Sequence, residues 1–251
     1  VSYLPGFDES LRHFGLGLAV DEVKLEAIER MNDIYSDYPV SFVSQVPSDY
    51  LPNAVALLEV GGPDPNGLGL LGYDNSPGKD FNNLRLDDKI GGANAETQEG
   101  GFPGFGGVFI ESFLFWSEDT SLNADRPVGA PPPDPLFDEI FGPVRRTSAS
   151  LAEISGTSGD PSREAEVRRA ILALSSMIGE TSAHEVGHSL GLAQPYGSPT
   201  AYHNSTPGEG CLMDSGGNRP LGERADQEGF ARTRFCADGP LYLNEIFGIE
   251  D

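Results

Sequence analysis

The feature that most constrains the fold is the stretch TSAHEVGHSLGLAQP, residues 181–195. His184 and His188 stand four residues apart, so on an α-helix both side chains lie on the same face and can bind one metal ion from one side. Glu185 stands beside them and can reach a metal-bound water without binding the metal itself. The stretch therefore predicts a helix that carries part of a metal site.

Two histidines do not complete a catalytic zinc site, because zinc takes three protein ligands there and keeps a fourth position open. Gln194 offers an amide oxygen, which is a poor zinc ligand. The chain has four histidines, and we interpret His13 as a surface or packing residue. His203 follows a turn-rich segment that can leave the end of the helix and return. We therefore expect His203 to be the third zinc ligand, beside His184 and His188.

The surrounding residues predict that this helix runs from about 160 to 190. Asp160 can cap its start, and Pro161 suits its first turn. Gly191 suits a left-handed C-cap. Gly179 lies in the interior, where we expect it to kink the helix.

The remaining pattern predicts an α+β fold in one domain, residues 1–251. Residues 20–38 have apolar side chains at three- and four-residue steps, which predicts an early helix capped by Asp21 and ended by Pro39. Several strands and a small irregular C-terminal part complete the expected fold. We place the N-terminal subdomain at about 1–191 and the C-terminal subdomain at about 192–251.

Smaller elements are assigned by composition. Strands are expected at 40–46, 54–60 and 107–116, with another candidate at 67–73. Residues 74–107 and 117–136 are rich in loop-forming residues. In the C-terminal part, the chain allows a short helix near 223–231 and an apolar segment, 240–247, that packs back on the body.

The charge excludes one class of partner. The chain has 39 acidic and 16 basic residues, a net charge of −23, whereas binding nucleic acid needs positive charge. An acidic surface favours solubility and attracts cations. No apolar run approaches the length of a membrane span, so we expect a soluble protein. We also expect a monomer. The chain starts at Val1, which we interpret as the start of a processed or trimmed chain.

The cysteine content suggests an oxidising compartment. The chain has two cysteines, Cys211 and Cys236, and we expect a disulfide between them; two buried thiols are the alternative. The bridge would close a loop of about 26 residues, worth roughly 3.5 kcal/mol in the chain-entropy description. We therefore expect a secreted, extracellular protein.

These motifs together resemble the metzincin clan of zinc peptidases. HEVGHSLG (184–191) matches its helix motif, and Met213 in GCLMDSG (210–216) matches its downstream methionine turn. The resemblance implies that Met213 lies beneath the histidines without binding the metal. It also implies a metzincin-like fold, with an early helix, a mixed sheet and the active-site helix.

The chain departs from the common metzincin pattern at two places. Residues 192–202 separate the glycine from His203, which resembles the longer insertion of leishmanolysin-like members. Ser215 stands where some metzincins have a tyrosine near the metal. Tyr196 and Tyr202 are therefore the candidates for a side chain that stabilises the transition state.

The resemblance implies a zinc-dependent endopeptidase that acts on proteins or peptides, with Glu185 as the general base. An extended substrate would pair with an edge strand, which the resemblance places within 107–116. Residues 214–222, after Met213, would form the wall of the pocket beyond the cleaved bond.

Other interpretations remain open on the residues alone. A gluzincin would use a downstream glutamate, Glu223 or Glu228, as third ligand. Peptide deformylases bind metal through a cysteine in a motif like EGCL (209–212), although there it precedes the histidines. A non-catalytic zinc module is the third alternative, and Glu185 argues against it because a structural site needs no base.

Calcium is a second candidate cofactor. Oxygen donors and glycines cluster at 64–67 (DPNG) and 74–80 (DNSPGKD), although neither segment fits an EF-hand loop and ordinary solvated loops explain them as well. Asn204 begins a glycosylation sequon that we attribute to chance, because it adjoins a proposed zinc ligand.

Overall fold

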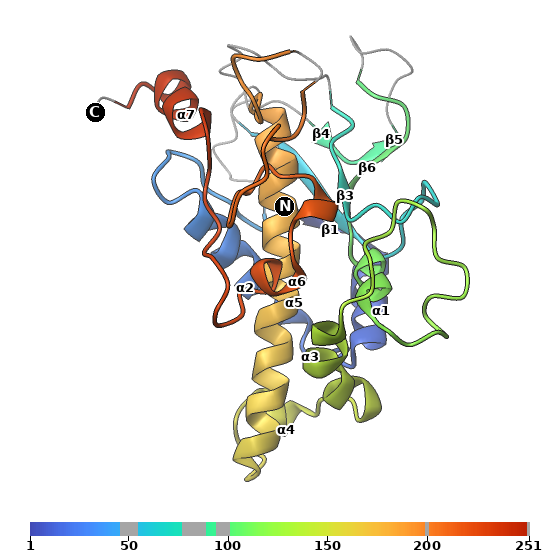
Figure 1. Cartoon of the computed structure of the whole chain (residues 1–251). Helices are drawn as coiled ribbons and strands as arrows, with labels where there is room; N and C mark the ends of the chain where they lie inside the picture. The colour runs from blue at the N-terminus through green and yellow to red at the C-terminus, as the bar shows by residue number, and fades with distance from the viewer. Residues whose placement is uncertain (46–54, 77–88, 94–100, 199–200, 250–251) are drawn as a thin grey trace.

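One long helix runs through the middle of the molecule and carries the metal-binding motif (Figure 1). In the computed structural model, which describes residues 1–45, 55–76, 89–93, 101–198 and 201–249, this helix is α5 (Pro161–Ser189). The Asp160 side chain accepts a hydrogen bond from the Arg163 amide, and Gly191 is left-handed with φ of 93°. Both expected ends of the helix are therefore confirmed.

Helix α5 continues without a break through Gly179, where we expected a kink. A Cβ at Gly179 would lie 2.8 Å from Cβ of Arg30, which belongs to α2 (Val20–Ile34). The glycine therefore allows the two helices to approach closely.

Helix α2 packs along α5 and forms much of the core. Its buried face consists of Val23, Ala27, Met31 and Ile34, as the apolar spacing predicted. Its start differs from the prediction: Ala19 is the N-cap residue and Asp21 lies in the first turn, where its charge favours the helix dipole. The helix ends at Ile34, before the expected stop at Pro39, and turns follow.

A mixed sheet lies beside the two helices (Figure 1). Its main order is β1-β2-β6-β3, with β4 paired to β2 and β5 paired to β6. β1, β2 and β6 are parallel, and β3 is antiparallel to β6. The strands are β1 (Ser2–Tyr3), β2 (Leu57–Gly61), β3 (Gly72–Tyr73), β4 (Lys89–Ile90), β5 (Gly92–Ala93) and β6 (Phe105–Phe109). The α+β class and the mixed sheet are therefore confirmed.

Several strand predictions need correction. Residues 40–45 form no strand, and residue 46 lies outside the described residues. Only Gly72–Tyr73 of the candidate at 67–73 is a strand, and the expected loop at 74–107 contains β4, β5 and the start of β6.

The expected strand at 107–116 is half strand and half helix. β6 ends at Phe109, and Ile110–Trp116 is a 3-10 helix. Ile110, Phe113 and Trp116 recur every three residues and are all buried, which matches the period of a 3-10 turn rather than a strand. Trp116 is thus a core residue.

Several helices were not predicted. The expected loop at 117–136 leads into α3 (Pro135–Arg146), which Asp134 caps and which buries Phe137, Ile140 and Phe141. The other unpredicted helices are α1 (Pro5–Ser10), a 3-10 turn (Leu11–Phe14) and α4 (Leu151–Ile154).

The C-terminal part is mostly irregular, as expected. Its described residues, 192–198 and 201–249, contain three short helical elements: a 3-10 turn (Gly216–Asn218), α6 (Leu221–Arg224) and α7 (Gly239–Phe247). The helix expected near 223–231 is misplaced, since α6 ends at Arg224. The apolar segment 240–247 does pack back, because α7 buries Tyr242, Leu243 and Ile246.

Cys211 and Cys236 form the expected disulfide, with Cα atoms 5.4 Å apart. This bond is compatible with an extracellular protein. Among the helices of the described residues, none has both the length and the apolar character needed to cross a bilayer.

Candidate metal centre

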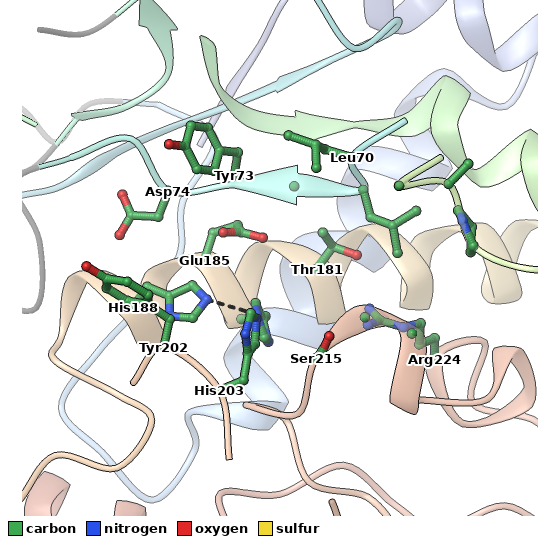
Figure 2. Close-up of a pocket in the computed structure, with 18 of the residues that line it drawn as sticks. Leu70, Tyr73, Asp74, Thr181, Glu185, His188, Tyr202, His203, Ser215 and Arg224 are labelled. Carbon is green, nitrogen blue, oxygen red and sulfur yellow. Dashed lines mark hydrogen bonds between the residues drawn. The ribbon is translucent and has the colours of Figure 1, made fainter. Parts of the chain in front are cut away.

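The structure brings together the three histidines that the sequence singled out (Figure 2). One ring nitrogen of each of His184, His188 and His203 lies within 4.8 Å of the other two. The Nε2 atoms of His184 and His188 are 3.0 Å apart. The His203 ring centroid lies 5.4 Å from that of His184 and 5.3 Å from that of His188. His184 and His188 are buried and His203 is exposed, so the cluster lies at the edge of the interior.

Backbone carbonyls orient the two helical imidazoles. His184 Nδ1 lies 2.7 Å from the Leu212 oxygen, and His188 Nδ1 lies 3.3 Å from the Leu192 oxygen. A carbonyl only accepts hydrogen bonds, so each Nδ1 carries the proton. The lone pairs on both Nε2 atoms then face the centre of the cluster, which is the arrangement that metal-binding histidines adopt.

The donor set fits a zinc-type ion. Zinc binds imidazole nitrogens at about 2.0–2.1 Å, which places two nitrogens of a tetrahedral site about 3.3 Å apart. The 3.0 Å between the two Nε2 atoms is close to that spacing. Burial, with the neighbouring His188 and His203, holds the pKa of His184 well below its usual range. Burial also lowers the pKa of His203. Both imidazoles therefore favour the neutral form that a metal requires.

Gln194 has a role that the sequence did not predict. It stands where the common third ligand would be, and its side-chain Nε2 donates a hydrogen bond of 2.7 Å to the backbone carbonyl of His203. The next residue, Asn204, is also fixed: its amide donates to the Met213 carbonyl and its side chain donates to Asp214. The segment that presents His203 is thus held on both sides, and the Asn204 side chain of the sequon is already engaged.

The Met213 side chain lies against helix α5 at Gly187. A Cβ at Gly187 would lie only 2.5 Å from the Met213 sulfur, so the thioether packs against α5 between the two histidines. Met213 is buried, and the preceding Leu212 supplies the carbonyl that orients His184. The glycine inside the motif is therefore required by the close approach of the methionine turn.

Glu185 lies beside the cluster and under strand β3. A Cβ at Gly72 would collide with the Glu185 carboxylate, so the strand backbone passes directly over it. Burial raises the pKa of Glu185 well above its usual range, and the Asp74 carboxylate adds to this. The Asp74 amide donates a hydrogen bond to Glu185 and opposes the shift, as does the charge of Arg224. A cation on the histidines would favour the ionised form further.

The histidines and Glu185 open into a cavity of about 620 Å³. Tyr202 lines it, and its ring lies 6.1 Å from that of His188. Tyr196 does not line it: this residue is 54% exposed, and its hydroxyl donates to Glu245 of α7. The structure therefore brings Tyr202, and not Tyr196, to the histidines.

The cavity also contains residues that the sequence did not indicate. Tyr73 and Asp74 line it near Glu185, and Arg224 lines it from α6. Tyr73 and Asp74 are about 150 residues from Arg224 in the sequence, so no sequence motif could link them. The fold alone brings them to the same cavity. Ser215–Gly217 form another part of the lining, within the segment 214–222 expected to form a wall.

The strand beside the cavity is β3, and the expectation that it lies within 107–116 is wrong. β6 is an interior strand, paired to β2 on one side and β3 on the other. Among the described residues β3 pairs with β6 alone, and Leu70–Asp74 line the cavity. An antiparallel edge strand therefore borders the metal cluster.

The other candidate ligands are engaged elsewhere. Glu223 accepts hydrogen bonds from Arg219 and from the Gly210 amide, one on each oxygen, and Glu228 is exposed and does not line the cavity. Cys211 is in the disulfide and has no thiolate to offer. Within the described residues, the three histidines are therefore the only group of metal-binding side chains found.

The calcium prediction gains no ligand group. The Asp64 carboxylate accepts hydrogen bonds from the amides of Asn66, Leu68 and Leu70 in its own loop. In the second segment, the Asp74 carboxylate accepts hydrogen bonds from the amide and the hydroxyl of Ser76, and residues 77–80 lie outside the described residues.

His13 is a surface residue, as expected. Its Nε2 atom lies 3.9 Å from Oε1 of Glu111.

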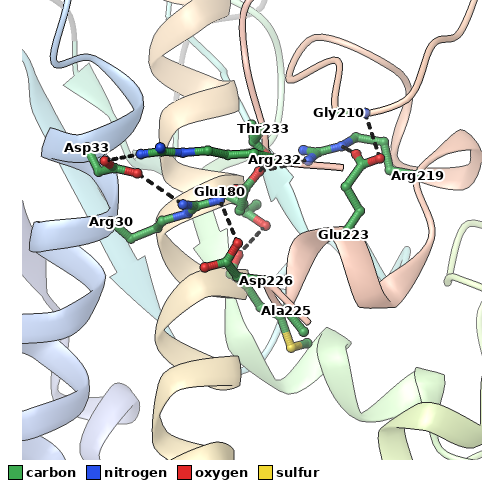
Figure 3. Close-up of polar contacts among 12 residues, drawn as sticks. Arg30, Asp33, Glu180, Gly210, Arg219, Glu223, Ala225, Asp226, Arg232 and Thr233 are labelled. Atoms are coloured by element: carbon green, nitrogen blue, oxygen red, sulfur yellow. Dashed lines mark hydrogen bonds and ion pairs between the residues drawn. The ribbon is translucent and has the colours of Figure 1, made fainter. Parts of the chain in front are cut away.

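A buried carboxylate fixes α5 relative to α2 and the C-terminal part (Figure 3). Glu180 lies one helical turn before His184 and is fully buried. Its Oε1 atom accepts hydrogen bonds from Nε (3.1 Å) and Nη2 (2.5 Å) of Arg30 in α2. The other oxygen accepts from Arg219 and from Thr233, both at 2.8 Å.

The network continues to the methionine turn. Arg219 also donates to Glu223 at 2.7 Å, and Glu223 accepts from the Gly210 amide at 2.8 Å. Gly210 adjoins Cys211 of the disulfide, two residues before Met213. A continuous set of polar contacts therefore joins the helix to the segment that supplies Met213.

Comparisons with known proteins identify no relative of this chain. No protein-family model matches it, and neither a curated protein nor a solved structure matches it. The likeness to metzincins therefore stays a prediction, and function is inferred from the residues of the cavity.

Glu180→Gln should lower the free energy of unfolding by about 3–5 kcal/mol, because it removes the buried counter-charge of Arg30 and one of the two buried counter-charges of Arg219. The measurement is urea unfolding followed by circular dichroism. Asp226→Asn is the matched control: Asp226 is exposed and 3.6 Å from Arg30, so its loss should cost less than about 1 kcal/mol. Equal losses in the two variants would contradict the role given to Glu180.

His203→Ala should weaken zinc binding by roughly 100- to 1,000-fold, since each ligand carries about a quarter of the roughly 10–16 kcal/mol found for structural zinc sites. The measurement is competition with a chelator of known affinity. His13→Ala, a surface histidine outside the cluster, is the control and should keep the affinity of the wild type. Unchanged affinity in His203→Ala would rule out this ligand.

Gln194→Met should weaken zinc binding by about 10- to 100-fold, the usual effect of losing an outer hydrogen bond that positions a ligand. Methionine keeps the length of the side chain and removes its donor. Tyr196→Phe, which removes a hydrogen bond from the same segment but away from the cavity, should leave the affinity unchanged. The assignment fails if both variants bind zinc as the wild type does.

Proposed function

We propose that this chain is a zinc-dependent endopeptidase of the metzincin type. The observation that carries the proposal is the position of one buried carboxylate, Glu185, next to three converging imidazoles at a cavity of about 620 Å³. Three neutral histidines and an open side are the donor set of catalytic zinc. Met213 beneath the helix and a third histidine from beyond the helix end support the metzincin comparison.

His184, His188 and His203 would hold the metal, and all three line the cavity. Zinc bound there would polarise the peptide carbonyl and lower the pKa of the attacking water. Glu185 would take the proton from that water and deliver it to the leaving amine. Its raised pKa suits this task, because a general base works best when its pKa is near the working pH.

The neighbouring elements suit an extended peptide. The edge of β3 would pair with the substrate main chain, as peptides add to exposed sheet edges in other proteins. Tyr202, close to His188, is the candidate for a hydroxyl that stabilises the transition state. The disulfide supports action outside the cell, where proteins and peptides would be the substrates.

A non-catalytic zinc module is the competing function. It gives no reason to bury the Glu185 carboxylate beside the ligands, since burying an ionisable group is costly. The gluzincin alternative receives no support, because Glu223 is engaged with Arg219 and Gly210.

Glu185→Gln should bind zinc as the wild type does and lose about 10²- to 10⁴-fold in peptide hydrolysis, the usual contribution of general acid–base catalysis. Zinc content and casein cleavage are measured on the same preparations. Glu245→Gln, which affects only the contact with Tyr196, is the matched control and should stay active. Full activity in Glu185→Gln would remove this residue as the base, and a zinc-loaded wild type that cleaves no peptide would favour the non-catalytic module.

A further inference from the structure

We propose that Arg224 binds a carboxylate of the substrate, so that the enzyme prefers peptides with an acidic group close to the cleaved bond. This inference rests on the proposed peptidase function. Arg224 belongs to α6 and lines the same cavity as the three histidines. It is the only arginine or lysine among the described residues that line this cavity.

The guanidinium lies inside the cavity although the residue is buried. Arg224 is 3% exposed, and Figure 2 shows its side chain beside Ser215 and below Thr181. A Cβ at Gly216 would lie 3.6 Å from Arg224 Nη2 and 3.7 Å from Leu71 Cδ1. The guanidinium thus forms a charged end to this part of the cavity.

Nearby acidic groups are already bound by other cations. Glu180 accepts from Arg30 and Arg219, and Glu223 accepts from Arg219. Within the described part of the chain, Arg224 has no ion pair, and its Nε has no hydrogen-bond partner. Burial and the charge of Arg219 lower the pKa of Arg224 to about 9, so the side chain stays charged at neutral pH. A buried guanidinium without an ion-pair partner has N–H groups that can donate to the carboxylate of a bound peptide.

The rest of the lining matches an acidic side chain. Leu70, Leu71, Val128 and Pro131 line the cavity together with Arg224 and provide an apolar surface for a methylene stem. The acidic groups of the cavity, Asp74 and Glu185, lie on the other side of Thr181 (Figure 2). A fork of N–H donors beside an apolar surface fits a glutamate or aspartate side chain, whose carboxylate the guanidinium can bind bidentately. A free C-terminal carboxylate offers the same chemistry.

Specificity profiling tests the proposal on the zinc-loaded chain. A library of peptides blocked at both ends is digested, and the cleavage sites are read by mass spectrometry. One cleaved sequence is then made with Glu and with Gln at each position near the cleaved bond, and with a free or amidated C-terminus. The wild type should prefer one carboxylate form over its amide by about 10- to 100-fold in kcat/KM, the range expected when a buried charge loses its partner.

The variants assign that preference to Arg224. Arg224→Gln should abolish the preference, and Arg224→Lys should reduce it, because an ammonium cannot bind bidentately. Arg232→Gln is the matched control, since Arg232 is an exposed arginine paired with Asp33 and lies outside the cavity. It should keep the preference. Equal kcat/KM for every acid and amide pair in the wild type would overturn the proposal while leaving the peptidase function intact.

A binding measurement separates this inference from catalysis. Zinc-loaded Glu185→Gln should bind the preferred acidic peptide more tightly than its amide counterpart by fluorescence anisotropy, without turnover. Adding Arg224→Gln or Arg224→Lys should remove or reduce the difference. If Arg224→Gln does not fold, the lysine variant and the wild-type comparison still decide. Acid-selective binding, together with no cleavage of any peptide by the zinc-loaded wild type, would support the carboxylate site and count against the peptidase. Equal binding of acid and amide would overturn the site.

Discussion

The candidate metal centre depends on one buried carboxylate. His184 and His188 come from α5, whereas His203 and Met213 come from the segment after it, so the centre exists only if the two parts are held in register. Glu180 provides this connection one turn from His184, because it accepts hydrogen bonds from α2 and from Arg219. Its desolvation is costly and is compensated only while those contacts are complete. The buried Glu180 carboxylate therefore keeps the three histidines aligned.

The same contacts that support the histidines also orient them. The Leu212 carbonyl that fixes the His184 ring precedes the methionine whose sulfur fills the space over Gly187. A shift of this turn would disturb the ring orientation and the packing under the helix together. Gln194 adds a third constraint, since it holds the backbone of His203. The ligands are thus preorganised by backbone groups, so that little order has to be gained when a metal binds.

The sequence predicted the features that depend on residues close together in the chain. The four-residue spacing of His184 and His188 and the caps of α5 depend on neighbours in the chain, and His203 followed from the scarcity of other ligands. The failures concern long-range contacts. Strand β3 is two residues long and is recognisable only through its pairing with β6, and the cavity position of Arg224 depends on how α6 meets α5. The 3-10 helix at Ile110–Trp116 was missed because its apolar residues also suit a strand.

The surface charge and the buried charge of Arg224 act at different stages of substrate binding. A net charge of −23 repels anionic molecules at long range and attracts cations, including a metal ion. Salt weakens that surface effect, because exposed charges are screened beyond about 8–10 Å at physiological ionic strength. The buried Arg224 is screened far less and acts only on a group that has entered the cavity. An acidic surface and a preference for a carboxylate at one position are therefore compatible, since surface charge governs the rate of encounter and the buried cation governs which bound peptide is favoured.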